Sequence, residues 1–64
     1  MKTQSGKKTV RWLQDLGWLI VATEGSHVQM RHPEKPGRVT VPLHGNEDLP
    51  IGTYLSIMRQ AGLK

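Results

Sequence analysis

The fold is decided by two short alternating stretches, Ser26-His27-Val28-Gln29-Met30-Arg31-His32 and Arg38-Val39-Thr40-Val41-Pro42. In each, apolar residues alternate with polar ones, which is the pattern of a β-strand with one buried and one exposed face. Between them lies a segment that contains Pro36-Gly37, a pair typical of the centre of a type II turn. We therefore expect an antiparallel hairpin whose loop is residues 33–36.

The alternation also fixes the register of this hairpin, because residues opposite each other on neighbouring strands share a face. A loop over 33–36 sets Met30 opposite Val39 and Val28 opposite Val41. Both apolar pairs then lie on one side of the hairpin. The pattern of side chains and the predicted loop length therefore agree.

The other side of the hairpin is predicted to be polar and basic. It holds His27, Gln29, Arg31, Arg38 and Thr40. The same register sets Arg31 opposite Arg38. Because two facing guanidiniums repel each other, their pairing favours an anion bound close to them.

A further strand and two helices are expected outside the hairpin. Residues 18–23 are rich in β-branched side chains and predict a strand, with both of its faces apolar and a tight turn at Glu24-Gly25 after it. Residues 7–16 and the residues from Pro50 to Gly62 carry apolar side chains at spacings of three and four, which predicts two amphipathic helices. Trp12, Trp18, Tyr54 and Met58 are assigned to the core. We expect an α+β fold in which both helices cover one face of a three-stranded antiparallel sheet.

Length and charge narrow the class of protein. A chain of 64 residues without cysteine supports one domain, residues 1–64, with residues 1–6 expected to be frayed. The net charge of +4 favours a polyanion as partner, with nucleic acid as the first candidate. The longest apolar run, residues 18–22, is far too short to cross a membrane, and the basic N-terminus lacks the apolar core of a signal peptide. We therefore expect no membrane association and a cytoplasmic location.

The histidines are the first candidates for chemistry. His27, His32 and His44 have no carboxylate or thiol at a metal-ligand spacing, and the chain lacks a glycine-rich phosphate loop, so no metal or other cofactor is expected. His32 and His44 are interpreted as turn-capping or surface residues. Histidine exchanges protons near neutral pH, and His27 shares its predicted face with two arginines. This set is sufficient for slow RNA cleavage, in which the ribose 2′-hydroxyl is the nucleophile, His27 moves a proton and the arginines stabilise the phosphorane.

Basic residues also gather near the N-terminus. They are Lys2, Lys7, Lys8 and Arg11. Such a cluster either solvates the face of a helix or follows the phosphates of a nucleic acid, and the salt dependence of binding separates the two interpretations.

A series of short segments runs from about Val10 to Leu63. It comprises Gly17-Trp18, Gly25-Ser26-His27, His32-Pro33, Val39-Thr40-Val41-Pro42, His44-Gly45, Asp48-Leu49, Gly52-Thr53 and Arg59-Gln60-Ala61-Gly62-Leu63. In order and spacing the series resembles the HicA family of mRNA interferase toxins. The resemblance implies an αβββα fold like that of double-stranded-RNA-binding domains. It also implies ribosome-independent mRNA cleavage without a metal, inhibited by a HicB antitoxin that covers the active face.

Carried onto this sequence, the resemblance places the family's catalytic histidine at His27. The turn that presents it falls on Gly25 and Ser26. The chain departs from many members at Val28, where a second histidine is common, and at Met30, where an aromatic residue is common; the first dozen residues also match poorly.

The sequence thus predicts an endoribonuclease toxin with His27 as general acid or base. The predicted RNA contacts are Lys7, Lys8, Arg11, Gln29, Arg31, Arg38 and Thr40. Two alternatives stay open. One is a non-catalytic RNA-binding module of the same fold, and the other is a small interaction protein whose basic face docks an acidic partner.

Overall fold

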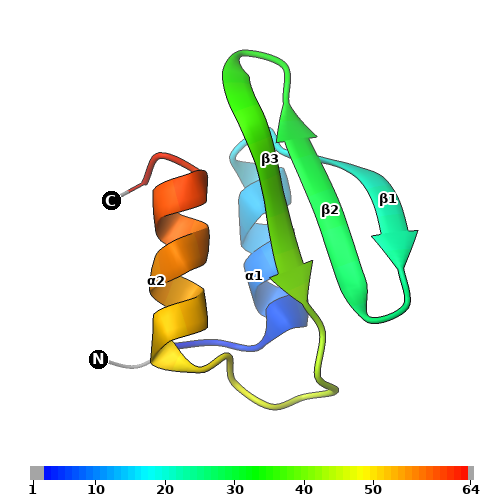
Figure 1. Ribbon diagram of the computed structural model, residues 1–64, viewed down its shortest axis with the longest axis vertical. Helices are drawn as coiled ribbons and strands as arrows, with labels where there is room; N and C mark the ends of the chain where they lie inside the picture. Colours follow the sequence, from blue (N-terminus) through cyan, green and yellow to red (C-terminus); the bar gives the residue numbers. More distant parts are fainter. Residues whose placement is uncertain (1–2, 64) are drawn as a thin grey trace.

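The computed structural model describes residues 3–63 and confirms the predicted α+β fold. Helix α1 (Gly6–Asp15) is followed by strands β1 (Leu19–Glu24), β2 (His27–His32) and β3 (Lys35–Pro42), and then by helix α2 (Ile51–Gln60). The strands form one antiparallel sheet in the order β1-β2-β3 (Figure 1). The order of elements is therefore the αβββα order that the sequence predicts.

A single core joins the helices to one face of the sheet. Its buried members are Val10, Leu13, Trp18, Val28, Met30, Val39, Val41, Leu49, Ile57 and Ala61, and Trp12, Leu43, Tyr54 and Met58 pack against them. The pairs Met30–Val39 and Val28–Val41 face each other as predicted. Because residues of both helices belong to this cluster, the two helices cover the same face of the sheet and leave the other face to solvent.

The loop of the β2–β3 hairpin is shorter than predicted. His32 pairs with Lys35, so the turn consists of Pro33-Glu34 instead of residues 33–36. The expected turn pair, Pro36-Gly37, lies inside β3, where the register shifts between Met30 and His32 and Gly37 has a φ of 85°. β3 is an edge strand, and an edge strand tolerates both a bulge and a proline without an N–H to donate.

Strand β1 forms the other edge of the sheet, away from α2 (Figure 1). Both helices pack against β3, and Leu19, Ile20 and Val21 are all exposed. The buried residue here is Trp18, which precedes the strand and is 1% exposed. The apolar character of both faces of β1 therefore reflects an uncovered edge and not a strand buried on both sides.

The N-terminal segment is held more firmly than the predicted fraying of residues 1–6 implies. The hydroxyl of Thr3 donates to the carbonyl of Leu49 at 2.6 Å, and the Leu49 N–H donates to the carbonyl of Gln4 at 2.9 Å. Ser5 is buried, and its hydroxyl accepts a hydrogen bond from the Lys8 N–H, which caps α1. Hydrogen bonds thus connect residues 3–5 to the rest of the fold, while residues 1 and 2 lie outside the described part of the chain.

The two helices are short. Each spans ten residues, and each is followed two residues later by a glycine with positive φ, Gly17 after α1 and Gly62 after α2. About 20 apolar residues are needed for a helix to cross a bilayer. Within residues 3–63, no helix meets that requirement.

Candidate functional site

The face of the sheet that the helices leave uncovered is polar, and we call it the outer face. Its polar residues are Glu24 on β1, His27, Gln29 and Arg31 on β2, and Arg38 and Thr40 on β3. The structure therefore brings together the five residues predicted to share this face and adds one that was not predicted. Gln29 and Thr40 are half-buried, and the other four are exposed.

His27 stands at one end of the outer face, as the first residue of β2. It pairs with Glu24 on one side and Pro42 on the other, so three strands fix its backbone. The preceding turn is Gly25-Ser26, and the Ser26 carbonyl accepts a hydrogen bond from the Leu43 N–H at 2.6 Å. The backbone is thus held in place while the imidazole is exposed to solvent.

A chain of hydrogen bonds crosses the outer face from β3 to β1. Nη1 of Arg38 donates to Oε1 of Gln29 at 2.5 Å, and Nε2 of Gln29 donates to Oε1 of Glu24 at 3.1 Å. The guanidinium fixes which end of the Gln29 amide is the acceptor, and this leaves the NH₂ group to donate to the carboxylate. Hydrogen bonds therefore link a cation on β3, an amide on β2 and an anion on β1.

The predicted contact between Arg31 and Arg38 is wrong. The β2–β3 ladder shifts after Met30, and Arg31 has no partner in β3. Arg38 turns to Gln29, and Arg31 pairs with Leu19 of β1. The bulge around Gly37 causes this, because β3 has residues 36–38 opposite the single residue Arg31, and the two extra residues break the one-to-one pairing beyond Met30. The argument for an anion between two facing guanidiniums therefore fails, although both arginines remain on the outer face.

Glu24 was predicted to be part of the turn and not a site residue. A signal was present, because the two-residue turn Gly25-Ser26 sets positions 24 and 27 opposite each other and on the same face. Placing the turn at Glu24-Gly25 concealed this pairing. The imidazole consequently has a carboxylate-bearing neighbour on the next strand.

The N-terminal cations lie in the helix layer. Lys7, Lys8 and Arg11 are exposed on α1, whose buried side is formed by Gly6, Thr9, Val10 and Leu13. The helices cover the opposite face of the sheet from His27, so these three residues do not join the outer face. The predicted RNA contacts are therefore divided between two surfaces.

The other two histidines occupy different environments. Nδ1 of His32 accepts a hydrogen bond from the Glu34 N–H at 3.0 Å, which confirms the turn-capping interpretation, and its ring packs edge-on to Trp18 with centroids 5.4 Å apart. His44 is exposed in the loop between β3 and α2. Neither residue is on the outer face.

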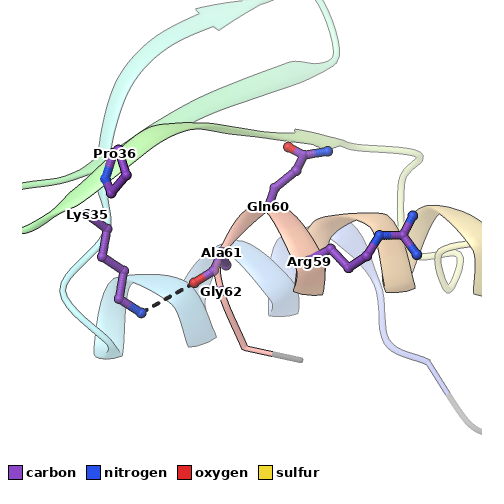
Figure 2. Close-up of a pocket in the computed structure, with 6 residues that line it drawn as sticks. All are labelled: Lys35, Pro36, Arg59, Gln60, Ala61 and Gly62. Atoms are coloured by element: carbon purple, nitrogen blue, oxygen red, sulfur yellow. Dashed lines mark hydrogen bonds between the residues drawn. The ribbon is translucent and has the colours of Figure 1, made fainter.

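A groove of about 230 Å³ lies between the start of β3 and the end of α2. Its lining is Lys35, Pro36, Arg59, Gln60, Ala61 and Gly62. Nζ of Lys35 donates to the Ala61 carbonyl at 3.3 Å, while Arg59 points away from Lys35 (Figure 2). A cation beside the last carbonyls of a helix stabilises that helix end. Lys35 is at the opposite end of the β2–β3 hairpin from His27, and the groove is therefore separate from the outer face.

Comparison with known proteins identifies the family. Residues 6–63 match the HicA toxin family of bacterial toxin-antitoxin systems, which is nearly the whole chain. The chain belongs to the HicA toxin family.

A second protein that matches this chain is much larger than the chain itself. Over 57 residues the chain is 33% identical to an uncharacterised KamA family protein of Methanocaldococcus jannaschii. The match includes 89% of the chain but only 9% of that protein. A segment similar to this chain therefore also occurs within a long polypeptide.

Residues 3–63 contain no group of three or more His, Cys, Asp or Glu side chains placed to hold a metal ion. The histidines are dispersed between the outer face, the β2–β3 turn and the loop before α2.

Proposed function

We propose that this protein is the toxin of a toxin-antitoxin pair and a metal-independent endoribonuclease, an mRNA interferase, with His27 as general acid or base. The observation that carries the proposal is the place of His27, which is exposed at the end of the outer face while three strands fix its backbone. The imidazole is thus free to meet a ribose-phosphate chain laid on the sheet. In the reaction the 2′-oxygen attacks the neighbouring phosphorus, a 2′,3′-cyclic phosphate forms, and the 5′-oxygen of the next nucleotide leaves with a proton.

The basic side chains of the outer face supply the binding energy in this proposal. Arg38 extends to Gln29, which is two residues from His27 along β2, or about 7 Å at the rise of an antiparallel strand. A guanidinium at that distance can bind a phosphate beside the one at His27 and stabilise its charge. Arg31 and Thr40 extend this surface, and Lys7, Lys8 and Arg11 form a second proposed contact along α1.

The proposed partners follow from the same surface. The substrate is mRNA, and the antitoxin is a HicB-like protein that inhibits the toxin by covering the outer face. An inhibitor seated there blocks His27 and Arg38 together. The proposed place of action is the cytoplasm, where mRNA is translated.

The test is an RNA cleavage assay in EDTA with purified protein and a defined mRNA. We expect wild type to cleave, and His27→Ala to lose cleavage and growth inhibition while keeping its fold. His44→Ala is the matched control, because it removes an exposed imidazole that is not on the outer face. Full cleavage by His27→Ala refutes the assignment of this residue. Salt-dependent RNA binding without cleavage by wild type favours a non-catalytic RNA-binding module instead.

A further inference from the structure

The cleavage proposed above requires two proton transfers, one from the 2′-hydroxyl and one to the leaving 5′-oxygen. In one step, a single imidazole cannot both donate a proton to the 5′-oxygen, which requires its protonated form, and accept a proton from the 2′-hydroxyl, which requires its neutral form. A second side chain close to the same phosphate, or a water molecule, must therefore perform the other proton transfer. Among the outer-face residues, Glu24 alone carries a carboxylate.

Glu24 lies where such a group is needed. It is the β1 partner of His27 in the ladder, so the two side chains leave adjacent backbone positions on the same face. Both side chains are exposed, which leaves them accessible to a substrate on the sheet. The hydrogen bond from Nε2 of Gln29 to Oε1 holds the carboxylate against β2, the strand that carries His27.

We propose that Glu24 is a second catalytic residue, the general base that accepts the proton of the 2′-hydroxyl. This rests on the proposed nuclease function. As the proton passes to the carboxylate, the bond between the 2′-oxygen and phosphorus forms. The bond from phosphorus to the 5′-oxygen breaks, and His27 in its protonated form donates a proton to that oxygen. Glu24 ends protonated and His27 neutral, and exchange with water restores both.

Gln29 is a positioning residue in this arrangement. Its amide oxygen is occupied by Arg38, so its NH₂ group has to face Glu24. One Oε1 atom of Glu24 accepts that hydrogen bond, which leaves the second oxygen of the carboxylate for the substrate proton. The groups that face Glu24 are His27 and Gln29 on β2, with Arg38 acting through Gln29 from β3.

The experiment compares the pH dependence of RNA cleavage by wild type and Glu24→Gln. A glutamine at position 24 can still accept the hydrogen bond from Gln29 but cannot accept a proton, so the substitution separates position from basicity. We expect the rate to fall by about 10²- to 10⁴-fold, the usual contribution of a general acid or base. We also expect the wild-type rate to decline toward low pH and the rate of the variant to lack that decline. Gln29→Leu should slow cleavage by a smaller factor and keep that decline.

The controls distinguish the two proposals. Glu47→Gln removes an exposed carboxylate in the loop before α2 and should leave the rate and its pH dependence unchanged. If wild type and Glu24→Gln cleave at the same rate with the same pH dependence, the role of Glu24 is overturned and the nuclease function stands. If wild type does not cleave RNA at any pH, the nuclease function is overturned and the role of Glu24 with it. Circular dichroism of each variant confirms that the fold is retained.

Discussion

Nε2 of His32 lies 3.2 Å from the carbonyl oxygen of Leu16 and so ties the start of the β2–β3 turn to the end of α1. The other ring nitrogen accepts the Glu34 N–H, which assigns the proton of the neutral ring to Nε2 and makes that atom the donor to Leu16. The ring also packs against Trp18, whose indole nitrogen is buried without a hydrogen-bond partner among the described residues. His32 is therefore a structural residue that links two elements.

The substitution His32→Ala should destabilise the fold without removing the proposed activity. It breaks two hydrogen bonds and exposes one side of Trp18, a loss of about 1–3 kcal/mol. The measurement is urea unfolding, followed by RNA cleavage at a temperature where the variant is folded. His27→Ala should give the reverse result, with the free energy of unfolding unchanged and cleavage lost. A His32→Ala variant that is fully stable and inactive would contradict this division.

The close approach of Gly17 to His32 makes a second prediction. Gly17 has a φ of 100°, and a Cβ built on it would lie 2.8 Å from Nε2 of His32. Gly17→Ala therefore adds a clash with the imidazole to the cost of a left-handed backbone. Gly25→Ala is the control, because it has a φ of 60° and open space around a Cβ. We expect a loss of about 1–2 kcal/mol for the control, and for Gly17→Ala a larger loss by about the 1 kcal/mol of a hydrogen bond. Equal midpoints in urea unfolding would argue against the clash.

The sequence predicted correctly those parts of the fold that a local pattern of side chains determines. Alternation along β2 and β3 was sufficient for the register of the pairs Val28–Val41 and Met30–Val39, because a shift by one residue would bury the polar face. The loop was predicted wrongly because Pro36-Gly37 fits both a type II turn and a bulge in an edge strand. Which of them forms depends on the neighbouring strands and helices, and a local pattern does not report these.

For the candidate site, the sequence likewise predicted part of the arrangement and not all of it. The five polar residues on the outer face followed from parity, but their contacts did not, because the bulge that separates Arg31 from Arg38 is a property of the folded pair of strands. The hydrogen bond from Arg38 to Gln29 depends on the rotamers of two long side chains, which spacing does not determine. Glu24 was not predicted because the turn was placed one residue too early, at Glu24-Gly25. A turn displaced by one residue changes which side chains lie on the same face of the sheet.

At Gly6, the first residue of α1, the stability change expected for Gly→Ala has the opposite sign from that at most helix positions. In most exposed helix positions Gly→Ala stabilises a protein by about 0.5–1 kcal/mol. At Gly6, however, a Cβ would overlap the carbonyl oxygen of Pro42, where α1 crosses the end of β3. Gly6→Ala should therefore lower the melting temperature, while Gly52→Ala in α2, where a Cβ meets nothing within 4 Å, should raise it. The expected loss at Gly6 is about 1–3 kcal/mol, as for other overpacked sites. A higher melting temperature for Gly6→Ala would show that α1 can move away from β3 at little cost.

The division of the basic residues between two surfaces gives the last prediction. Each phosphate contact that is lost lowers the slope of log affinity against log salt concentration by about one. We expect Arg38→Gln to lower this slope by about one and to slow cleavage of bound RNA, because in the proposed mechanism its guanidinium stabilises the charge of a phosphate near His27. Lys7→Gln combined with Lys8→Gln should lower the slope by about two and leave the cleavage of bound RNA unchanged, since α1 is on the other side of the sheet from His27. Arg59→Gln, a cation in the last turn of α2, is the control and should leave the slope as it is. If the double lysine variant binds RNA with the slope of wild type, the α1 cations serve to solvate the helix, and the outer face alone binds the substrate.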